Sequence, residues 1–252
     1  MPSKETLNTN EYISKRMVVK IGSSSISRGG NPLNKEFVGN IAKQASTLFR
    51  ARVEIALVSS GSVVSGKRIL DLSEDDVLQD QIAAIYGQNY LMDIWNEEFK
   101  PFNIPVGQVL FSEEDLQKPN TPILFGMKHG IQIINANDAT NDVEMKAFLK
   151  SADNDKLAGH VAKFVKADTL LLLTDTDGVI DSNGNVIQEM KQGTEVSLLG
   201  KSGVGTGGMI SKVDVAFDCT RAGIRTVIAN ASEKDVILNL AQGKKIGTLF
   251  VE

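Results

Sequence analysis

The sequence predicts an α/β protein whose mostly parallel sheet is covered by helices on both faces. Short apolar runs alternate with segments of helical periodicity along most of the 252 residues. Two of these runs, residues 53–58 and 169–173, consist mainly of apolar residues, as do strands that are buried on both faces in parallel sheets. Because no repeat, low-complexity segment or linker divides the chain, we expect one domain over residues 1–252, with a flexible tail over residues 1–15.

The remaining elements follow in a regular order. Strands are predicted at residues 17–21, 53–58, 105–111, 131–134, 169–173, 225–229 and 247–251. Helices are predicted at residues 34–50, after Ser62, at 77–99 with Gly87 interrupting the pattern, after Ser112, at 122–129, 153–166 and 209–222, and from Lys234. Asn183-Gly184 lies between two pairs of apolar residues and predicts a small hairpin.

Composition excludes several classes of function. Hydrophobic residues make up 42% of the chain and charged residues 23%, as in a soluble globular protein. The net charge of −4 provides no electrostatic footprint for nucleic acid or an anionic membrane. The N-terminal segment is polar and no apolar run approaches a membrane span, so we expect a cytoplasmic protein without nucleic-acid or membrane partners. The single cysteine, Cys219, excludes an internal disulfide and suits a buried helix face.

Small, polar and charged residues collect where the predicted strands end. Ligands of parallel sheets bind beyond the carboxyl ends of the strands, so we expect the site at this edge. The residues concerned are Lys20, Gly22, Ser23, Ser60, Gly61, Asp138, Thr174 and Asp175. Each also has a structural interpretation: a strand lysine can extend its ammonium to water, and serine, asparagine and aspartate are common in caps and turns.

A glycine-rich segment, residues 201–212, precedes and enters the predicted helix 209–222. Its glycines at positions 203, 205, 207 and 208 leave backbone N–H groups accessible at a helix N-terminus, which is an arrangement that binds anions. Lys212 adds a cation one turn into the helix. The segment lacks the Walker A pattern, and a flexible surface loop before an ordinary helix explains it equally well by itself.

Two lysines and two carboxylates at one sheet edge suit phosphoryl transfer, which depends on charge placement more than on covalent chemistry. Residues 153–155, Asp-Asn-Asp, contribute to this group although they also resemble a helix-capping cluster. No histidine or cysteine accompanies Ser60 in a nucleophile motif, so we do not expect an acyl-enzyme. His129 and His160 are isolated, and no transition-metal site is expected.

Taken together, these segments resemble the amino acid kinase family, in family order across nearly the whole chain. The matching segments are Val19-Lys20-Ile21-Gly22-Ser23-Ser24, Val58-Ser59-Ser60-Gly61, Gly87-Gln88, Ile134-Asn135-Ala136-Asn137-Asp138, Asp153-Asn154-Asp155, Leu172-Leu173-Thr174-Asp175 and Gly205-Thr206-Gly207-Gly208-Met209-Ile210-Ser211-Lys212. Three places depart from the usual pattern. Ala136 replaces a glutamate, the glycine that usually follows Ser-Gly is shifted to Gly66, and Gly178-Val179-Ile180 replaces a Gly-Leu-Tyr segment.

The resemblance implies a three-layer α/β/α sandwich with a mostly parallel central sheet. It also implies transfer of phosphate from ATP, with Mg²⁺, to the γ-carboxylate of L-glutamate at the start of proline synthesis, by a homodimer or homotetramer. By position, Lys20 and Lys212 resemble the lysines that neutralise the transferring group, and Asp155 resembles the aspartate that holds them. The implied substrate-binding residues are Ser60, Gly61, Asp138 and Asn154. The implied nucleotide-binding residues are Lys20, Gly22, Ser23, Thr174, Asp175, Thr206, Gly207, Gly208, Met209, Ile210, Ser211 and Lys212, and no residue is implied as a metal ligand.

Two alternatives remain open from the sequence. A sister kinase acting on aspartate, N-acetylglutamate or a nucleoside monophosphate usually carries Lys-x-Gly-Gly, where this chain has Lys20-Ile21-Gly22-Ser23. A non-catalytic amino-acid sensor of the same fold would have no need of both lysines and Asp155. Release of ADP that requires glutamate separates these possibilities.

Overall fold

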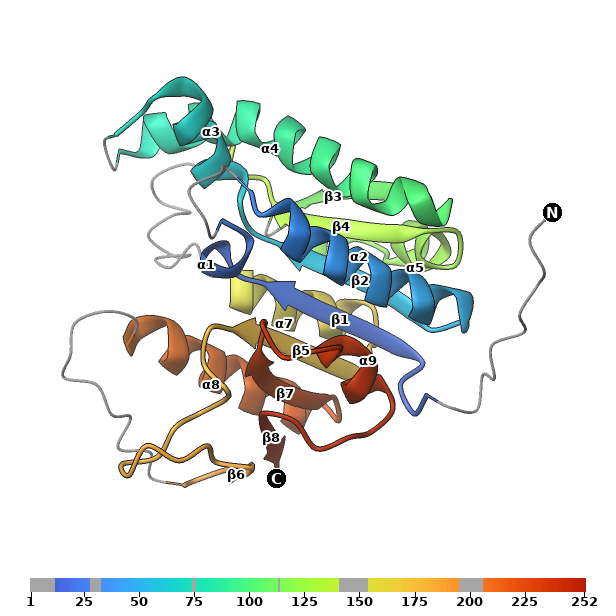
Figure 1. Cartoon of the computed structure of the whole chain (residues 1–252), viewed down its shortest axis with the longest axis vertical. Helices are drawn as coiled ribbons and strands as arrows, with labels where there is room; N and C mark the ends of the chain where they lie inside the picture. Colours follow the sequence, from blue (N-terminus) through green and yellow to red (C-terminus); the bar gives the residue numbers. More distant parts are fainter. Residues whose placement is uncertain (1–11, 28–32, 74–75, 113, 141–153, 195–205) are drawn as a thin grey trace.

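The computed structural model describes residues 12–27, 33–73, 76–112, 114–140, 154–194 and 206–252. Within these residues an eight-stranded sheet lies between two helical layers (Figure 1). The strand order is β3-β4-β2-β1-β5-β7-β8-β6. All neighbouring strands are parallel except β7 and β8, so β8 and β6 run against the other six. The predicted three-layer α/β/α sandwich with a mostly parallel sheet is confirmed.

The predicted strands are confirmed to within two residues at each end. They are β1 (Arg16–Ile21), β2 (Glu54–Ser59), β3 (Val106–Phe111), β4 (Ile131–Ala136), β5 (Thr169–Thr174), β7 (Arg225–Asn230) and β8 (Thr248–Val251). The edge strand β6 (Glu189–Lys191) was not predicted, because three residues with only the central one buried carry too little pattern. An antiparallel bridge between Ile180 and Val186 confirms the hairpin at Asn183-Gly184.

The predicted helices are also present, except the one expected after Ser112. They are α2 (Lys35–Arg50), α3 (Ser62–Leu70), α4 (Val77–Phe99), α5 (Thr121–Met127), α7 (Asn154–Phe164), α8 (Thr206–Arg221) and α9 (Val236–Ala241). Two short elements were not predicted: the helix α1 (Ser23–Ile26), which follows β1, and a 3-10 turn, η1 (Lys100–Phe102), which follows α4. The segment after Ser112 is a 3-10 turn, η2 (Glu114–Gln117), in which the Asp115 carboxylate accepts hydrogen bonds from Ser112.

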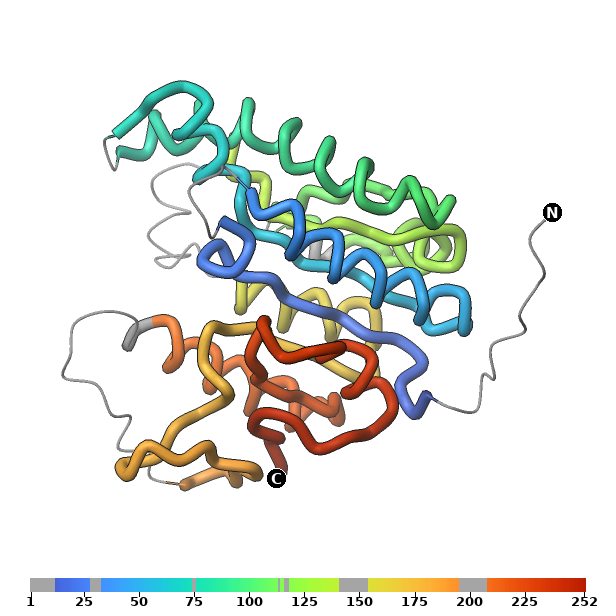
Figure 2. The backbone as a smooth tube through the Cα atoms, in the orientation of Figure 1, coloured from blue at the N-terminus to red at the C-terminus, as the bar shows by residue number. Residues whose placement is uncertain are grey.

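Alternation along β1 directs its side chains to opposite layers. Met17, Val19 and Ile21 belong to the core beneath α2, α4 and α9, whereas Val18 belongs to the core beneath α5, α7 and α8. Lys20 follows Val18 on the second face, so its side chain extends toward α7 and α8 at the end of the strand. In Figure 2 the chain from α2 to β4 forms one half of the molecule, and the chain from α7 to the C-terminus forms the other. Strand β1 lies between these halves.

Gly87 does not interrupt α4, because it is a point of contact between helices. A Cβ on Gly87 would lie 1.8 Å from the carbonyl oxygen of Ser62, and a Cβ on Gly66 would lie 1.8 Å from that of Ala83. The two glycines therefore let α3 and α4 approach backbone to backbone. This approach brings Gln88 of α4 next to the start of α3.

Part of the expected N-terminal tail is packed against the domain. The backbone N–H of Ile13 donates to Ala241 at 2.8 Å, and the hydroxyl groups of Ser14 and Thr169 lie 2.8 Å apart. Tyr12 and Ser14 are buried, while residues 1–11 lie outside the described part of the chain. Among the described helices none combines the length and the hydropathy that crossing a bilayer requires.

Candidate active site

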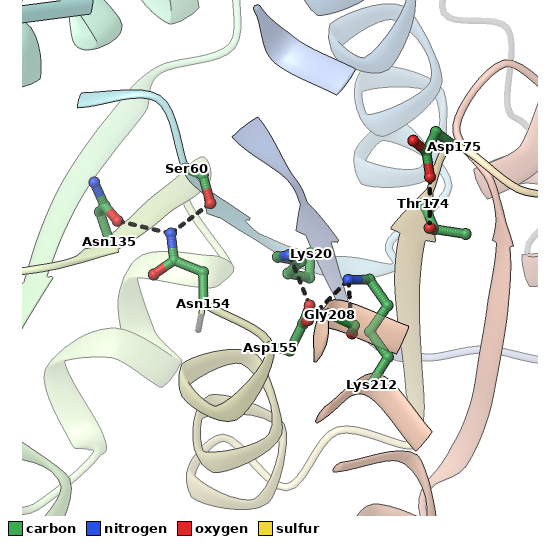
Figure 3. A network of polar contacts seen from close by, with 9 residues as sticks. All are labelled: Lys20, Ser60, Asn135, Asn154, Asp155, Thr174, Asp175, Gly208 and Lys212. Carbon is green, nitrogen blue, oxygen red and sulfur yellow. Dashed lines mark hydrogen bonds and ion pairs between the residues drawn. The ribbon is translucent and has the colours of Figure 1, made fainter. Parts of the chain in front are cut away.

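Three residues from separate elements meet at the carboxyl edge of the sheet. Asp155 forms an ion pair with each of two lysines. Lys20 Nζ lies 2.7 Å from Oδ1, and Lys212 Nζ lies 2.9 Å from Oδ2. Their side chains are 8% exposed for Lys20, 12% for Lys212 and 1% for Asp155. We call this group the Lys20–Asp155–Lys212 cluster. It joins the central strand β1 to the first turns of α7 and α8 (Figure 3).

The local structure explains why these charges are tolerated. Asp155 lies in the first turn of α7, where backbone N–H groups and the helix dipole favour a carboxylate. Lys212 lies one turn inside α8 and also donates to the carbonyl oxygen of Gly208 at 3.3 Å. One carboxylate between two ammonium groups leaves a net charge of +1, which is suited to an anion.

A second group of polar side chains lies beside this cluster, on the β2 and β4 side. The amide Nδ2 of Asn154 donates to Ser60 Oγ at 2.6 Å and to Asn135 Oδ1 at 3.2 Å. Asn135 in turn donates to Ser62 Oγ and Gln88 Oε1, both at 3.0 Å. Because these bonds occupy the donor side of the Asn154 amide, its carbonyl oxygen can accept a hydrogen bond from a ligand.

Hydrogen bonds from Trp95 and Ser59 hold the backbone at Ser60 in place. The indole Nε1 of Trp95 donates to Ser59 Oγ at 3.2 Å, and this hydroxyl donates to the carbonyl oxygen of Ser60 at 3.1 Å. Gly61 follows with φ of +117°, a conformation that side chains rarely adopt. A Cβ there would also lie 3.1 Å from Leu33. Only glycine therefore turns the chain from β2 into α3 at this point without strain.

The predicted nucleotide residues of β5 lie on the opposite side of the cluster. Thr174 ends β5, and its hydroxyl lies 3.3 Å from the carboxylate of Asp175. The loop that follows is held by Asn230, which donates to Asp177 at 2.7 Å, and by Thr248 Oγ1, which accepts from Val179 N at 2.8 Å. In Figure 3 the cluster lies between Ser60 and Asn154 on one side and Thr174 and Asp175 on the other.

The structure also locates the other predicted residues. Gly22 and Ser23 form the turn from β1 into α1, where a Cβ on Gly22 would lie 3.5 Å from Lys20 Nζ. Asp138 is partly buried in the turn after β4. Thr206, Gly207, Gly208, Met209, Ile210 and Ser211 form the start of α8. The rest of the glycine-rich segment, residues 201–205, and Asp153 lie outside the described residues.

Two residues of the site had no role assigned from the sequence. Asn135 was noticed as part of a segment, but the structure shows it 1% exposed and hydrogen-bonded to Asn154. Trp95 falls in the middle of an apolar helical pattern, where a tryptophan signals only a core position. Asn135 is a polar residue at the buried end of an apolar strand, and this was the sequence feature that could have indicated its role.

The described residues contain no cluster of three or more histidine, cysteine, aspartate or glutamate side chains that could hold a metal ion. Both carboxylate oxygens of Asp155 are already paired with lysines.

Comparisons with known proteins identify the family of the chain. The model of the "Amino acid kinase family" matches residues 15–230. The chain is 37% identical to the glutamate 5-kinase of Methanococcoides burtonii, covering 97% of this chain and 70% of that protein. It is 36% identical to the glutamate 5-kinase of Clostridium acetobutylicum, covering 97% of this chain and 98% of that protein.

A solved structure supports the fold. The UMP kinase of Bacillus anthracis superposes with a TM-score of 0.63 over 94% of this chain and 96% of that one. The sequence identity of 14% limits this likeness to architecture.

Proposed function

The chain belongs to the amino acid kinase family, and we propose that it is a glutamate 5-kinase. The reaction transfers the γ-phosphoryl group of ATP to the γ-carboxylate of L-glutamate and forms L-glutamyl 5-phosphate, the first step of proline biosynthesis. The observation that carries the proposal is the Lys20–Asp155–Lys212 cluster between two groups of polar residues, one for each substrate.

The proposed chemistry needs charge neutralisation more than proton transfer. A carboxylate is already ionised near neutral pH, so the acceptor requires no general base. One γ-carboxylate oxygen bonds to the γ-phosphorus while the bond from that phosphorus to the bridging oxygen breaks, and ADP leaves with the electron pair. In this proposal Lys20 and Lys212 neutralise the charge of the transferring group, which is worth several kcal/mol in such sites, about 3–4 by analogy with single oxyanion donors.

Asp155 acts through the lysines and not on the substrates. Its two oxygens fix both ammonium groups, so the cations are already oriented before the substrates arrive. Such preorganisation avoids rearrangement during the reaction, which is why it contributes to the rate.

The acceptor side is proposed to bind glutamate through three kinds of group. The Ser60 hydroxyl and the N–H of Gly61 suit a carboxylate, and the carbonyl oxygen of Asn154 suits the α-ammonium group. Asp138, in the turn after β4, adds a negative charge for the same ammonium. Asn135 and Gln88 do not need to touch the substrate, since they hold Asn154 in place.

The nucleotide side is proposed to comprise Gly22, Ser23, Thr174, Asp175 and the start of α8. We further propose that Mg²⁺ enters with ATP and is held by its phosphates, because the described residues provide no carboxylate cluster for it. The ion then supplies additional neutralisation of phosphate charge. The dependence on ATP suggests that the enzyme acts in the cytoplasm.

We also propose that the enzyme is a homodimer or homotetramer. Leu78, Ile82, Ile85 and Tyr86 recur on one face of α4 with exposures between 36% and 61%, and Ile69 of α3 is 47% exposed. An apolar face of this kind is unusual on a monomer. Light scattering of the wild-type protein and of an Ile82→Asp variant tests this part of the proposal. It requires the particle mass of the wild type to be larger than that of the variant.

The decisive experiment is ADP release from ATP with a panel of acceptors. L-glutamate should support turnover, whereas N-acetylglutamate, L-aspartate and UMP should give at most a small fraction of it. Lys212→Ala should abolish most of the activity, and Lys163→Ala, the same change on an exposed part of α7, should leave it intact. Faster turnover of any other acceptor would replace glutamate kinase by the corresponding sister activity.

A further inference from the structure

A cavity of about 260 Å³ lies at the other side of the domain from the Lys20–Asp155–Lys212 cluster. It is bounded by the start of β7, by β8, by the start of β6 and by the connection from α9 to β8, in the lower part of Figure 1. None of its lining residues has a place in the proposed kinase site. Its size is close to the lower end of the range for small-molecule sites, about 300–1,000 Å³.

Cations gather at this cavity although the whole chain carries a net charge of −4. Arg225 lines it from the first position of β7, and Lys244 and Lys245 line it from the connection before β8. The one carboxylate of the lining, Glu189, lies 3.8 Å from Lys245 Nζ, and both side chains of this pair are largely exposed. Such a pair contributes little and leaves the remaining positive charge uncompensated.

Arg225 is the central group of the cavity. Its Nη1 donates to the carbonyl oxygen of Leu240 at 3.0 Å, near the end of α9, and its other guanidinium N–H groups have no hydrogen-bond partner among the described residues. Burial lowers the pKa of Arg225, while the nearby charge of Asp168 raises it.

The hydrogen bonds of the Asp168 carboxylate go to groups other than the Arg225 guanidinium. Its Oδ2 accepts from the backbone N–H groups of Lys15 and Arg16, both at 2.8 Å, and its Oδ1 accepts from Thr169 at 2.8 Å. The partly buried guanidinium therefore keeps N–H donors that are hydrogen-bonded to no carboxylate among the described residues, and a planar pair of such donors matches two oxygens of a carboxylate or phosphate.

The other lining residues, apart from Gln188, carry no polar side chain. Val227, Ile246 and Leu249 line the cavity next to Arg225. Gly247 packs directly against β7, since its φ is +58° and a Cβ there would lie 2.1 Å from the carbonyl oxygen of Ile228. An apolar surface favours a ligand with a short hydrocarbon part over water or a bare inorganic ion.

We propose that this cavity binds a small organic anion, whose carboxylate or phosphate pairs with Arg225 and whose apolar part rests on Val227, Ile246 and Leu249. Lys244 and Lys245 draw the anion to the opening. The site shares no residue with the proposed kinase site, so anion binding here is tested independently of the kinase activity.

The test is a calorimetric titration of the full chain with three probes: hexanoate, butyl phosphate and the neutral hexanamide. Hexanoate or butyl phosphate should bind, and hexanamide should bind at least about tenfold more weakly, since a charge-assisted hydrogen bond is worth ten- to a hundredfold. A preference between the two anions identifies the head group. Binding of hexanamide as tight as that of the tighter anion, or no binding by either anion, overturns the proposal.

Variants locate the binding. Arg225→Gln should weaken the bound anion at least about tenfold. Arg221→Gln, the same loss of charge on exposed α8, should leave the affinity unchanged. Because Arg225 also caps α9, Lys244→Gln combined with Lys245→Gln provides a second variant with exposed positions only, and a severalfold loss is expected from it. Anion binding that is the same in wild type and all variants would assign it to another site and refute the proposal.

Discussion

Replacing Asp155 by asparagine tests the central feature of the site. The change keeps the shape of the side chain and removes the one negative charge that lies 2.7 Å from Lys20 Nζ and 2.9 Å from Lys212 Nζ. The side chains of Lys20 and Lys212 are 8% and 12% exposed, and their ammonium groups would then face a neutral amide. Removing one partner from a buried charge pair typically costs about 3–5 kcal/mol, and the opening toward the substrates should place this case at the lower end.

Two measurements are needed, because stability and catalysis respond differently. Urea unfolding without nucleotide should show the free energy of unfolding lowered by about 3 kcal/mol. ATP should restore more stability to Asp155→Asn than to the wild type, because its phosphates replace the lost negative charge. Steady-state kinetics should show kcat reduced by about a hundredfold with KM for glutamate changed only modestly, as expected for a residue that orients groups acting in the transition state.

Asp218→Asn is the matched control. Asp218 pairs with Lys163 on the exposed surface of α7 and α8, so the same loss of charge should alter neither quantity much. The reasoning would be refuted if Asp155→Asn retained normal kcat and normal stability. A rise in the KM for glutamate alone would instead make Asp155 a substrate ligand.

Four further outcomes are expected. Lys212→Ala should lower kcat about a hundredfold while the protein stays folded, as circular dichroism would check; unchanged turnover would remove Lys212 from the transfer step. Asp138→Ala should raise the KM for glutamate roughly ten- to a hundredfold and leave the KM for ATP nearly unchanged. It should also reduce the preference for glutamate over glutarate, and an unchanged preference would count against a contact between Asp138 and the α-ammonium group. Trp95→Phe keeps an aromatic ring but loses the bond to Ser59, so the KM for glutamate should rise severalfold at similar kcat; a fall in kcat alone would contradict this. Cys219 is buried with its pKa raised to about 11 by burial, so it stays protonated at pH 8 and should react with a thiol reagent only after unfolding; rapid labelling of the native protein would disprove this.

The sequence by itself determined the fold class and the edge of the sheet that carries the site. The apolar run of β5 and the amphipathic pattern of α2 predict their elements because strand and helix periods depend on residues a few positions apart. Lys20 in an apolar strand and the glycine-rich start of α8 pointed to a charged ligand for the same local reason. The resemblance then supplied roles for these residues.

Other features were decided only by the tertiary structure. Gly87 weakens a helix on local grounds, yet it is required where α4 touches Ser62. The pairing of Asn154 with Ser60 joins residues 94 positions apart, and that of Lys212 with Asp155 joins residues 57 apart. Arg225 reads in the sequence as one more charged residue, although the fold places it in a cavity. Local patterns specify which faces are apolar, and many strand orders bury such faces equally well. Here the position of β1 between β2 and β5 brings the two halves of the site together.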